Sequence, residues 1–343
     1  DTAETDYEVP LPKPLTVGIT YTLKKETSDK APDSEAEFDS IDTVNAIAAA
    51  LEKHGCKTML LEADASLAEK LKNGAKPDII FNIAEGRGGR GREAQIPELL
   101  DMLGIPYAGS DGTALAVSLD KDMTKRLLST WNVKTPKSAV VGRAGLKGTE
   151  KLKFPVIVKP NAEGSGKGIT DVSVAADSAA LGTLIDKNIA LYGEDMLAEE
   201  YISGREFTVG LIGNGDSLRV FEPMEIIYNK KTDGNYCVYS YNVKQNYKAY
   251  VEYRCPADID KKTSDKLKKS ARAAFCGLGC SDFARADFRL SDNGEVYFIE
   301  INPLPGLAPG YSDYPMLADF NGVTYDELIY GVLCAALKRL GEI

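Results

Sequence analysis

Apolar and polar residues along positions 15–118 alternate between a period typical of strands and one typical of helices. Strand-like apolar runs occupy residues 16–21, 58–61 and 78–83. Apolar residues within 41–51 recur at spacings of three and four, which predicts an amphipathic helix. Ser40 is placed to cap its start and Gly55 to end it. Strands that alternate with helices in this way predict a parallel sheet with helices on its faces.

Two further blocks of predicted elements follow. A lysine-rich helix expected over residues 120–130 opens the second block, which also contains a strand-like run at 154–159. The third block holds strand-like runs at 205–212, 219–227, 282–290 and 295–302. We therefore predict an α/β fold that becomes α+β in its C-terminal part, with domains at 15–118, 119–203 and 204–343. The acidic and then proline-punctuated residues 1–14 are typical of a tail or linker.

The composition is that of a folded globular chain. Of 343 residues, 43% are hydrophobic and 27% charged, which excludes disordered and fibrous classes. The formal net charge of −10 argues against nucleic acid or an anionic membrane surface as the main partner. No stretch approaches the roughly 18 consecutive apolar residues of a membrane span, and residues 1–4 show no signal-peptide pattern. We expect a cytoplasmic protein.

The scarcity of histidine limits the chemistry. His54 is the only histidine, and it stands at the end of a predicted helix, where a structural role is favoured. The six cysteines are scattered without a CxxC pair. These counts argue against Ser-His-Asp and Cys-His catalysis, zinc sites and a disulfide framework.

Residues 281–306 carry the strongest chemical signal. Asn293-Gly294 predicts a two-residue type I′ hairpin loop. In that register Asp287 faces Glu300 and Arg285 faces Asn302, all on one face of the hairpin. The other face would be apolar, with Phe288 opposite Ile299, Ala286 opposite Ile301 and Leu290 opposite Tyr297.

Two facing carboxylates repel each other, so a cation is expected between them. Oxygen ligands from Asp287, Glu300 and Asn302 suit Mg²⁺, which takes substrate phosphates as further ligands. The alternative is a solvated surface hairpin in which Arg285 and Arg289 neutralise the acids.

Three other segments are chemically ambiguous. Residues 159–168 (KPNAEGSGKG), here called the glycine-rich segment, depart from a Walker A motif at Asn161 and Gly168, and they suit either a phosphate cradle or an ordinary connection. Residues 199–206 place acids where a ribose or adenine would be bound, or where they bind nothing. Residues 86–93 (GRGGRGRE), here called the arginine loop, suit an anion-binding loop, a mobile surface loop or an RNA-binding element.

Taken in order, these segments resemble the D-alanine–D-alanine ligases of the ATP-grasp superfamily, from about Leu15 to Leu340. The matching motifs are residues 103–110 (LGIPYAGS), 120–121 (DK), 155–160 (PVIVKP), 204–209 (GREFTV), 284–288 (ARADF) and 300–306 (EINPLPG). The resemblance implies a Rossmann-like N-terminal domain, followed by central and C-terminal domains that clamp ATP. It also implies phosphorylation of a carboxylate by ATP and attack of an amine on the acyl phosphate.

The resemblance assigns roles by residue. Lys121 and Lys159 would contact the ATP phosphates, together with Glu163, Ser165 and Gly166 of the glycine-rich segment. Glu199 and Glu206 would contact the adenine and ribose side, and Lys244 the phosphate end. Asp287, Glu300 and Asn302 would hold two Mg²⁺ ions, with Mn²⁺ as a substitute. Arg285 would stabilise the oxyanion and form the catalytic centre with Ser165 and Gly306. Gly306 and Ser312 would help to seat the substrate.

The chain departs from the family around the first substrate. The family's N-terminal Gly-Gly-x-Ser-x-Glu segment is absent, so Glu37 or Glu35 is the candidate for the substrate ammonium. Gln245 follows Lys244 where many members have Tyr. The arginine loop, with Glu93 as a second substrate candidate, stands where the family has a His-Gly pair.

The expected function is an ATP-dependent carboxylate–amine ligase that joins two small amino acids, D-alanine being the leading case, in peptidoglycan biosynthesis. One alternative keeps this chemistry with a hydroxyl acceptor or a specialised metabolite. Another is a nucleotide-binding scaffold without catalysis, against which Arg285 speaks. We expect small-molecule partners, neither nucleic acid nor membrane, and allow for a homodimer.

Overall fold

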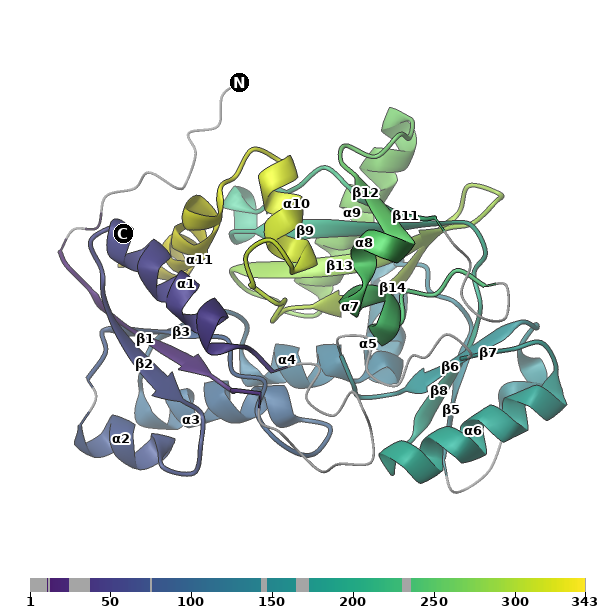
Figure 1. The fold of residues 1–343 in the computed structure, drawn as a ribbon, viewed down its shortest axis with the longest axis horizontal. Helices are drawn as coiled ribbons and strands as arrows, with labels where there is room; N and C mark the ends of the chain where they lie inside the picture. Colours follow the sequence, from purple (N-terminus) through teal and green to yellow (C-terminus); the bar gives the residue numbers. More distant parts are fainter. Residues whose placement is uncertain are drawn as a thin grey trace.

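The structure is a computed structural model. It describes residues 11, 13–24, 38–74, 76–142, 147–164, 173–229 and 236–342, except for the side chain of Tyr241. Three β-sheets follow one another along the chain (Figure 1). No helix in the described ranges is long and apolar enough to cross a membrane.

The first sheet is four-stranded and parallel, with strand order β2-β1-β3-β4. Its strands are β1 (Thr16–Tyr21), β2 (Lys57–Glu62), β3 (Ile79–Asn82) and β4 (Tyr107–Ala108). The helices of this part are α1 (Ile41–Lys53), α2 (Leu67–Asn73), α3 (Gln95–Leu103) and α4 (Gly112–Leu119). The predicted parallel sheet is confirmed.

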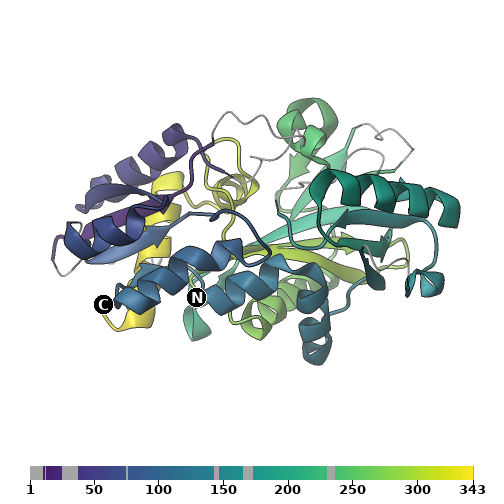
Figure 2. The same ribbon diagram turned by 90° about the horizontal axis from the view of Figure 1, so that it is seen from below.

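Helices cover both faces of this sheet. Ser40 caps α1 as expected, because its hydroxyl oxygen accepts the Thr43 N–H at 3.3 Å. Apolar residues of α1 pack on the face that carries Ile19 and Phe81, while α2 and α3 pack on the face that carries Ile80. Helix α11 (Tyr325–Leu340) lies beside α1 in both views (Figures 1 and 2) and joins the same core. The C-terminal helix therefore completes the core of the first sheet.

The second sheet is antiparallel, with strand order β5-β8-β6-β7. Its strands are β5 (Ser138–Val141), β6 (Val156–Pro160), β7 (Val174–Ala175) and β8 (Met196–Glu200). Helix α6 (Ser178–Tyr192) covers one face through Leu181 and Ile185. Helix α5 (Lys121–Leu128), capped by Asp120, precedes this sheet where the lysine-rich helix was predicted.

The third sheet is antiparallel and six-stranded, with order β12-β11-β9-β13-β14 and β10 paired to β9. Its strands are β9 (Arg205–Ile212), β10 (Arg219–Val220), β11 (Met224–Tyr228), β12 (Val251–Arg254), β13 (Phe283–Leu290) and β14 (Val296–Asn302). The helices of this part are α7 (Tyr241–Gln245), α8 (Tyr247–Tyr250), α9 (Lys261–Gly277) and α10 (Asp313–Phe320). Helix α9 packs on the apolar face of the sheet.

One predicted strand of this sheet is wrong. The run at 219–227 is interrupted at residues 221–223 and forms two strands, β10 and β11. Pro223 has no N–H to donate to a ladder, and the pairing of both strands with β9 shifts by one residue across the interruption.

The predicted hairpin turn is also wrong. The loop has three residues, 292–294, because Ser291 pairs with Glu295, and only Gly294 has a positive φ of 77°. Near the turn Phe288 faces Phe298 and Leu290 faces Val296, one residue away from the predicted register. A bulge at Ile299 then restores the expected pairs, Asp287 with Glu300 and Arg285 with Asn302.

The three sheets lie within the three residue ranges predicted as domains. Helix α11 nevertheless packs on the first sheet although it belongs to the range 204–343. The division at 15–118, 119–203 and 204–343 therefore stays a prediction.

Candidate functional site

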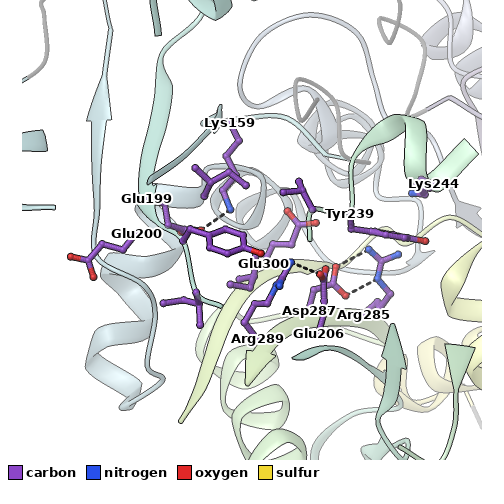
Figure 3. A pocket seen from close by; sticks show the side chains of 15 residues that line it. Lys159, Glu199, Glu200, Glu206, Tyr239, Lys244, Arg285, Asp287, Arg289 and Glu300 are labelled. Carbon is purple, nitrogen blue, oxygen red and sulfur yellow. Dashed lines mark hydrogen bonds and ion pairs between the residues drawn. The ribbon is translucent and has the colours of Figure 1, made fainter. Parts of the chain in front are cut away.

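Two pockets adjoin each other between the second and third sheets and the arginine loop. The first is shown in Figure 3, and its lining includes Lys159, Glu199, Glu206, Tyr239, Asp287 and Arg289. The lining of the second includes Glu85, Glu93, Lys121, Glu163, Asn302 and Gly306. Lys244, Arg285 and Glu300 line both pockets, so these three side chains stand where the pockets meet.

The facing acids Asp287 and Glu300 are partly buried and charge-compensated. Arg285 donates from Nε and Nη2 to the two oxygens of Asp287 at 3.1 and 2.9 Å. Burial and the nearby Glu300 raise the pKa of Asp287 against the effect of Arg285. Burial also acts on Glu300, but Lys121, 3.5 Å away, and Lys159 outweigh it, so the pKa of Glu300 is lowered. The alternative of a solvated hairpin is wrong, although Arg285 does neutralise Asp287.

The donor set at the junction fits a divalent cation. Asp287 and Glu300 come from directly paired positions of β13 and β14, and Asn302 follows on the same face of β14. Among the described residues, no group of three His, Cys, Asp or Glu is arranged to hold a metal ion. A cation here would therefore use two carboxylates and an amide oxygen, and its remaining ligands would come from solvent or phosphate, as Mg²⁺ or Mn²⁺ accepts.

Glu199 lies between two buried lysines. The Lys159 ammonium is 3.1 Å from Glu199 Oε1, and the Lys125 ammonium contacts Oε2 (Figure 3 shows the first pair). Burial, with the charge of Lys121 added, lowers the pKa of Lys159 to about 8. Burial likewise lowers the pKa of Lys125, with Lys159 adding to the effect. Sequence reasoning missed Lys125, because its spacing on a lysine-rich helix does not distinguish it from surface lysines.

Glu206 is held by an arginine and a tyrosine. Arg289 Nη2 is 2.7 Å from Glu206 Oε2, and the Tyr228 hydroxyl donates to the same oxygen at 2.5 Å. Burial raises the pKa of Glu206 against the opposing effect of Arg289. Arg289 also donates to the Cys237 carbonyl at 2.6 Å, which fixes its orientation in the pocket wall.

Arg285 is held from two sides. Beyond its contacts with Asp287, its Nη1 lies 3.5 Å from Asp313 Oδ2. Asp313 Oδ1 in turn accepts from the hydroxyls of Tyr239 and Tyr253, each at 3.1 Å. Burial opposes the charge of Arg285, but Asp287 and Asp313 outweigh it and raise its pKa. A permanently charged donor therefore stands at the junction of the pockets.

The second pocket is lined by several acids and by Gly306. Glu93, a predicted substrate residue, is buried in the short 3₁₀ helix Arg92–Ala94 and lines the pocket. Glu85 lines it too and was missed, although its place just after β3 is where α/β sheets bind ligands. A side chain at Gly306 would place its Cβ 2.9 Å from Ser312 Oγ, so Ser312 lies directly behind Gly306.

Other predicted site residues are only partly located. Lys244 lines both pockets from α7, and burial lowers its pKa. The next residue, Gln245, donates from Nε2 to the Tyr311 hydroxyl at 2.9 Å. Ser165, Gly166 and Glu37, with its alternative Glu35, lie outside the described residues.

The sequence profile of the family described as "D-ala D-ala ligase C-terminus" matches residues 134–334. A D-alanine–D-alanine ligase of Aquifex aeolicus is 36% identical over 297 residues, which cover 86% of this chain and 94% of that protein.

Two solved structures share the fold. A D-alanine–D-alanine ligase of Bacillus anthracis, solved with ATP, has a TM-score of 0.74 and 22% identity, and the match covers 96% of this chain and 99% of that one. The VanG D-Ala:D-Ser ligase of Enterococcus faecalis has a TM-score of 0.73 and 20% identity, covering 94% and 100%. The likeness in fold confirms the predicted ATP-grasp class.

Proposed function

The chain belongs to the D-alanine–D-alanine ligase family, and we propose from this premise that it is an ATP-dependent ligase of two small amino acids. In this proposal ATP occupies the first pocket and the amino acids occupy the second. The two substrates would then meet at Lys244, Arg285 and Glu300, the side chains that line both pockets. This junction is the observation that carries the proposal, because phosphoryl transfer needs the donor and the acceptor in contact.

The polar groups of the first pocket suit a nucleotide. Lys159 lines the first pocket and Lys121 lines the second, and both buried ammonium groups lie near Glu300 at the junction, where a triphosphate would supply negative charge. Glu199, at the end of β8, would accept from the adenine amino group, and Glu206 from the ribose hydroxyls. We place Mg²⁺ at Asp287, Glu300 and Asn302, where it would neutralise charge on the transferred phosphoryl group.

The proposed reaction has two steps. A carboxylate oxygen of the first amino acid attacks the γ-phosphorus of ATP, and ADP leaves, which gives an acyl phosphate. The amine of the second amino acid then attacks the acyl carbon, and phosphate leaves as the peptide bond forms. Arg285, held by Asp287 and Asp313, is positioned to donate to the oxyanion that develops in the second step.

Charge in the second pocket supports amino-acid substrates. Glu93 and Glu85 would attract a substrate ammonium, and Arg285 and Lys244 a substrate carboxylate. We propose D-alanine for both positions, since the Aquifex aeolicus relative is named for that substrate. The dipeptide would serve peptidoglycan synthesis. Cytoplasmic location and a homodimer stay predictions.

The test is ADP release by the purified protein with ATP, Mg²⁺ and a panel of D- and L-amino acids, singly and in pairs, with D-lactate included. The expected result is release that depends on D-alanine, with the dipeptide detected by mass spectrometry. An Arg285→Met variant is the matched control, because it should bind ATP but lose turnover. ATP binding without ADP release for any pair would favour the scaffold alternative, and ester formation with D-lactate would favour a hydroxyl acceptor.

A further inference from the structure

The arginine loop is closed on itself by Gly86 and Gln95. Gly86 has φ +67° and lies so close to the Arg92 carbonyl that a Cβ would come within 2.1 Å of its oxygen. The Gln95 amide accepts from the Arg87 N–H at 3.1 Å and donates to the Arg87 carbonyl at 3.0 Å. The backbone of the loop is therefore braced at both ends, and Arg92 leaves it from a defined position.

Arg92 reaches from this loop to the start of the glycine-rich segment. Its Nη1 donates to the Ala162 carbonyl at 2.9 Å, and its Nη2 is 2.8 Å from Glu163 Oε2. The side chain of Arg92 is 6% exposed and that of Glu163 12%. Because both charges are nearly removed from water, loss of either partner would leave the other buried and uncompensated, which costs far more than loss of a surface ion pair.

Lys121 holds the same stretch of backbone from the other side. Its ammonium donates to the Glu163 carbonyl, and its own N–H donates to the Asn161 carbonyl at 2.9 Å. Lys121 precedes the second sheet, whereas Arg92 follows β3 of the first. Residues 161–163 are thus held between two parts of the chain that carry different sheets.

The two ends of the Arg92 contact belong to the site. Glu93, the next residue, lines the second pocket, and so do Glu163 and Gly164. A shift of the arginine loop when a ligand enters the second pocket would therefore reach Ala162 and Glu163 through the side chain of Arg92. The other two arginines of the loop that carry side-chain contacts, Arg87 and Arg90, are exposed.

We propose that Arg92 is a positioning residue that couples amino-acid binding in the second pocket to nucleotide binding in the first, through residues 159–164, which run from the first pocket at Lys159 to the second at Glu163 and Gly164. This inference rests on the proposed function for the identity of the ligands, but not for the contact itself. By linkage, an amino acid that tightens nucleotide binding must itself be bound more tightly when the nucleotide is present, by the same factor. This mutual increase in affinity would depend on the contacts of Arg92 with residues 162 and 163.

The test compares Arg92→Met with Arg90→Met, a matched loss of one arginine from the same loop. Arg90 pairs with Asp120 at 2.9 Å, but its side chain is 69% exposed. Affinity for a non-hydrolysable ATP analogue is measured calorimetrically with and without D-alanine. Arg92→Met is expected to remove the D-alanine effect and to lower kcat/KM about tenfold or more, as for loss of a charge-assisted contact. Arg90→Met should retain both.

Amide hydrogen exchange on the ligand-free protein tests the contact without any ligation. Peptides that contain residues 159–164 should exchange faster in Arg92→Met and at the wild-type rate in Arg90→Met. If Arg92→Met does not fold, Gln95→Ala replaces it, because this variant removes the hydrogen bonds that hold the Arg87 backbone. We expect Gln95→Ala to speed exchange and to weaken the D-alanine effect on nucleotide affinity, as Arg92→Met would. Arg92→Lys should recover only part of the exchange protection and of the coupling, since one ammonium cannot reproduce the two-donor fork of arginine.

The outcomes separate the two proposals. Absence of ADP release by the wild type would overturn the proposed ligase function. The exchange measurement would still test whether Arg92 holds residues 159–164 in place. Ligation by the wild type together with unchanged exchange and unchanged coupling in Arg92→Met would overturn the coupling role. A lower melting temperature with unchanged coupling would reduce Arg92 to a structural residue and would also overturn it.

Discussion

Replacing Asp287 by asparagine is expected to destabilise the ligand-free protein. Two facing carboxylates alone would suggest the opposite, because removing one relieves their repulsion. In the structure, however, both carboxylate oxygens of Asp287 accept hydrogen bonds from Arg285. The side chain of Asp287 is only 17% exposed and that of Arg285 only 9%. The substitution therefore leaves a buried guanidinium with Asp313 as its remaining carboxylate, at 3.5 Å.

The expected loss follows from three contributions. Removing one partner of a buried ion pair costs about 3 to 5 kcal/mol. Relief of the repulsion with Glu300 returns up to about 1 kcal/mol. The contact that Arg285 keeps with Asp313 reduces the loss by about 1 kcal/mol more. We therefore expect a decrease of about 2 kcal/mol in the free energy of unfolding. Because Asp287 is a proposed Mg²⁺ ligand, the substitution should also remove Mg²⁺-dependent turnover.

Urea unfolding at pH 7 without Mg²⁺ or ATP measures this loss. Glu300→Gln is the control, because Glu300 has a longer contact, at 3.5 Å to Lys121, and should lose less stability. Both variants should lose the added stability that Mg²⁺ and ATP give to the wild type. An Asp287→Asn variant as stable as the wild type would refute the reasoning, since repulsion would then outweigh the Arg285 pair.

Three further predictions concern charge. Because burial lowers the pKa of Lys159 to about 8, its ammonium is lost as pH rises through that value, so kcat/KM for ATP should fall about tenfold per pH unit above it. Lys159→Arg, charged throughout, should flatten the profile. Arg285→Met should lower turnover about 100-fold or more in single-turnover assays while ATP still binds. Asp282→Asn should lower the free energy of unfolding, measured in urea, by about 2 to 4 kcal/mol. Asp282 is fully buried, and its two carboxylate oxygens accept from Arg339 Nε and Nη2 at 3.0 and 2.8 Å.

Much of the fold could be predicted because strand and helix periods are local properties. The run at 205–212 coincides with β9, where apolar residues alternate without a proline or an internal turn signal. The prediction of one strand over 219–227 was wrong, because Pro223 interrupts the hydrogen-bonded ladder with β9, between β10 and β11. The packing of α11 on α1 could not be predicted, because an amphipathic helix shows that it has a buried face but not which surface covers it.

The site was predictable where its residues share one hairpin and hidden where they do not. Asp287 and Glu300 are thirteen positions apart and are brought together by the turn between them. The partners of Glu199 and Glu163, namely Lys125 and Arg92, lie 74 and 71 positions away on other elements. No local period connects such pairs, so sequence reasoning recognised these two acids but not Lys125 and Arg92.

The hairpin shows how a correct pairing can rest on a wrong turn. A three-residue loop continued without a bulge would set Asp287 opposite Ile299 and turn Glu300 toward the apolar face. The bulge at Ile299 adds one residue to β14, so Phe298 and Ile301 both face the core while Ile299 and Glu300 both line the first pocket. The acidic pair is therefore built by an irregularity in the strand, which side-chain alternation alone does not reveal.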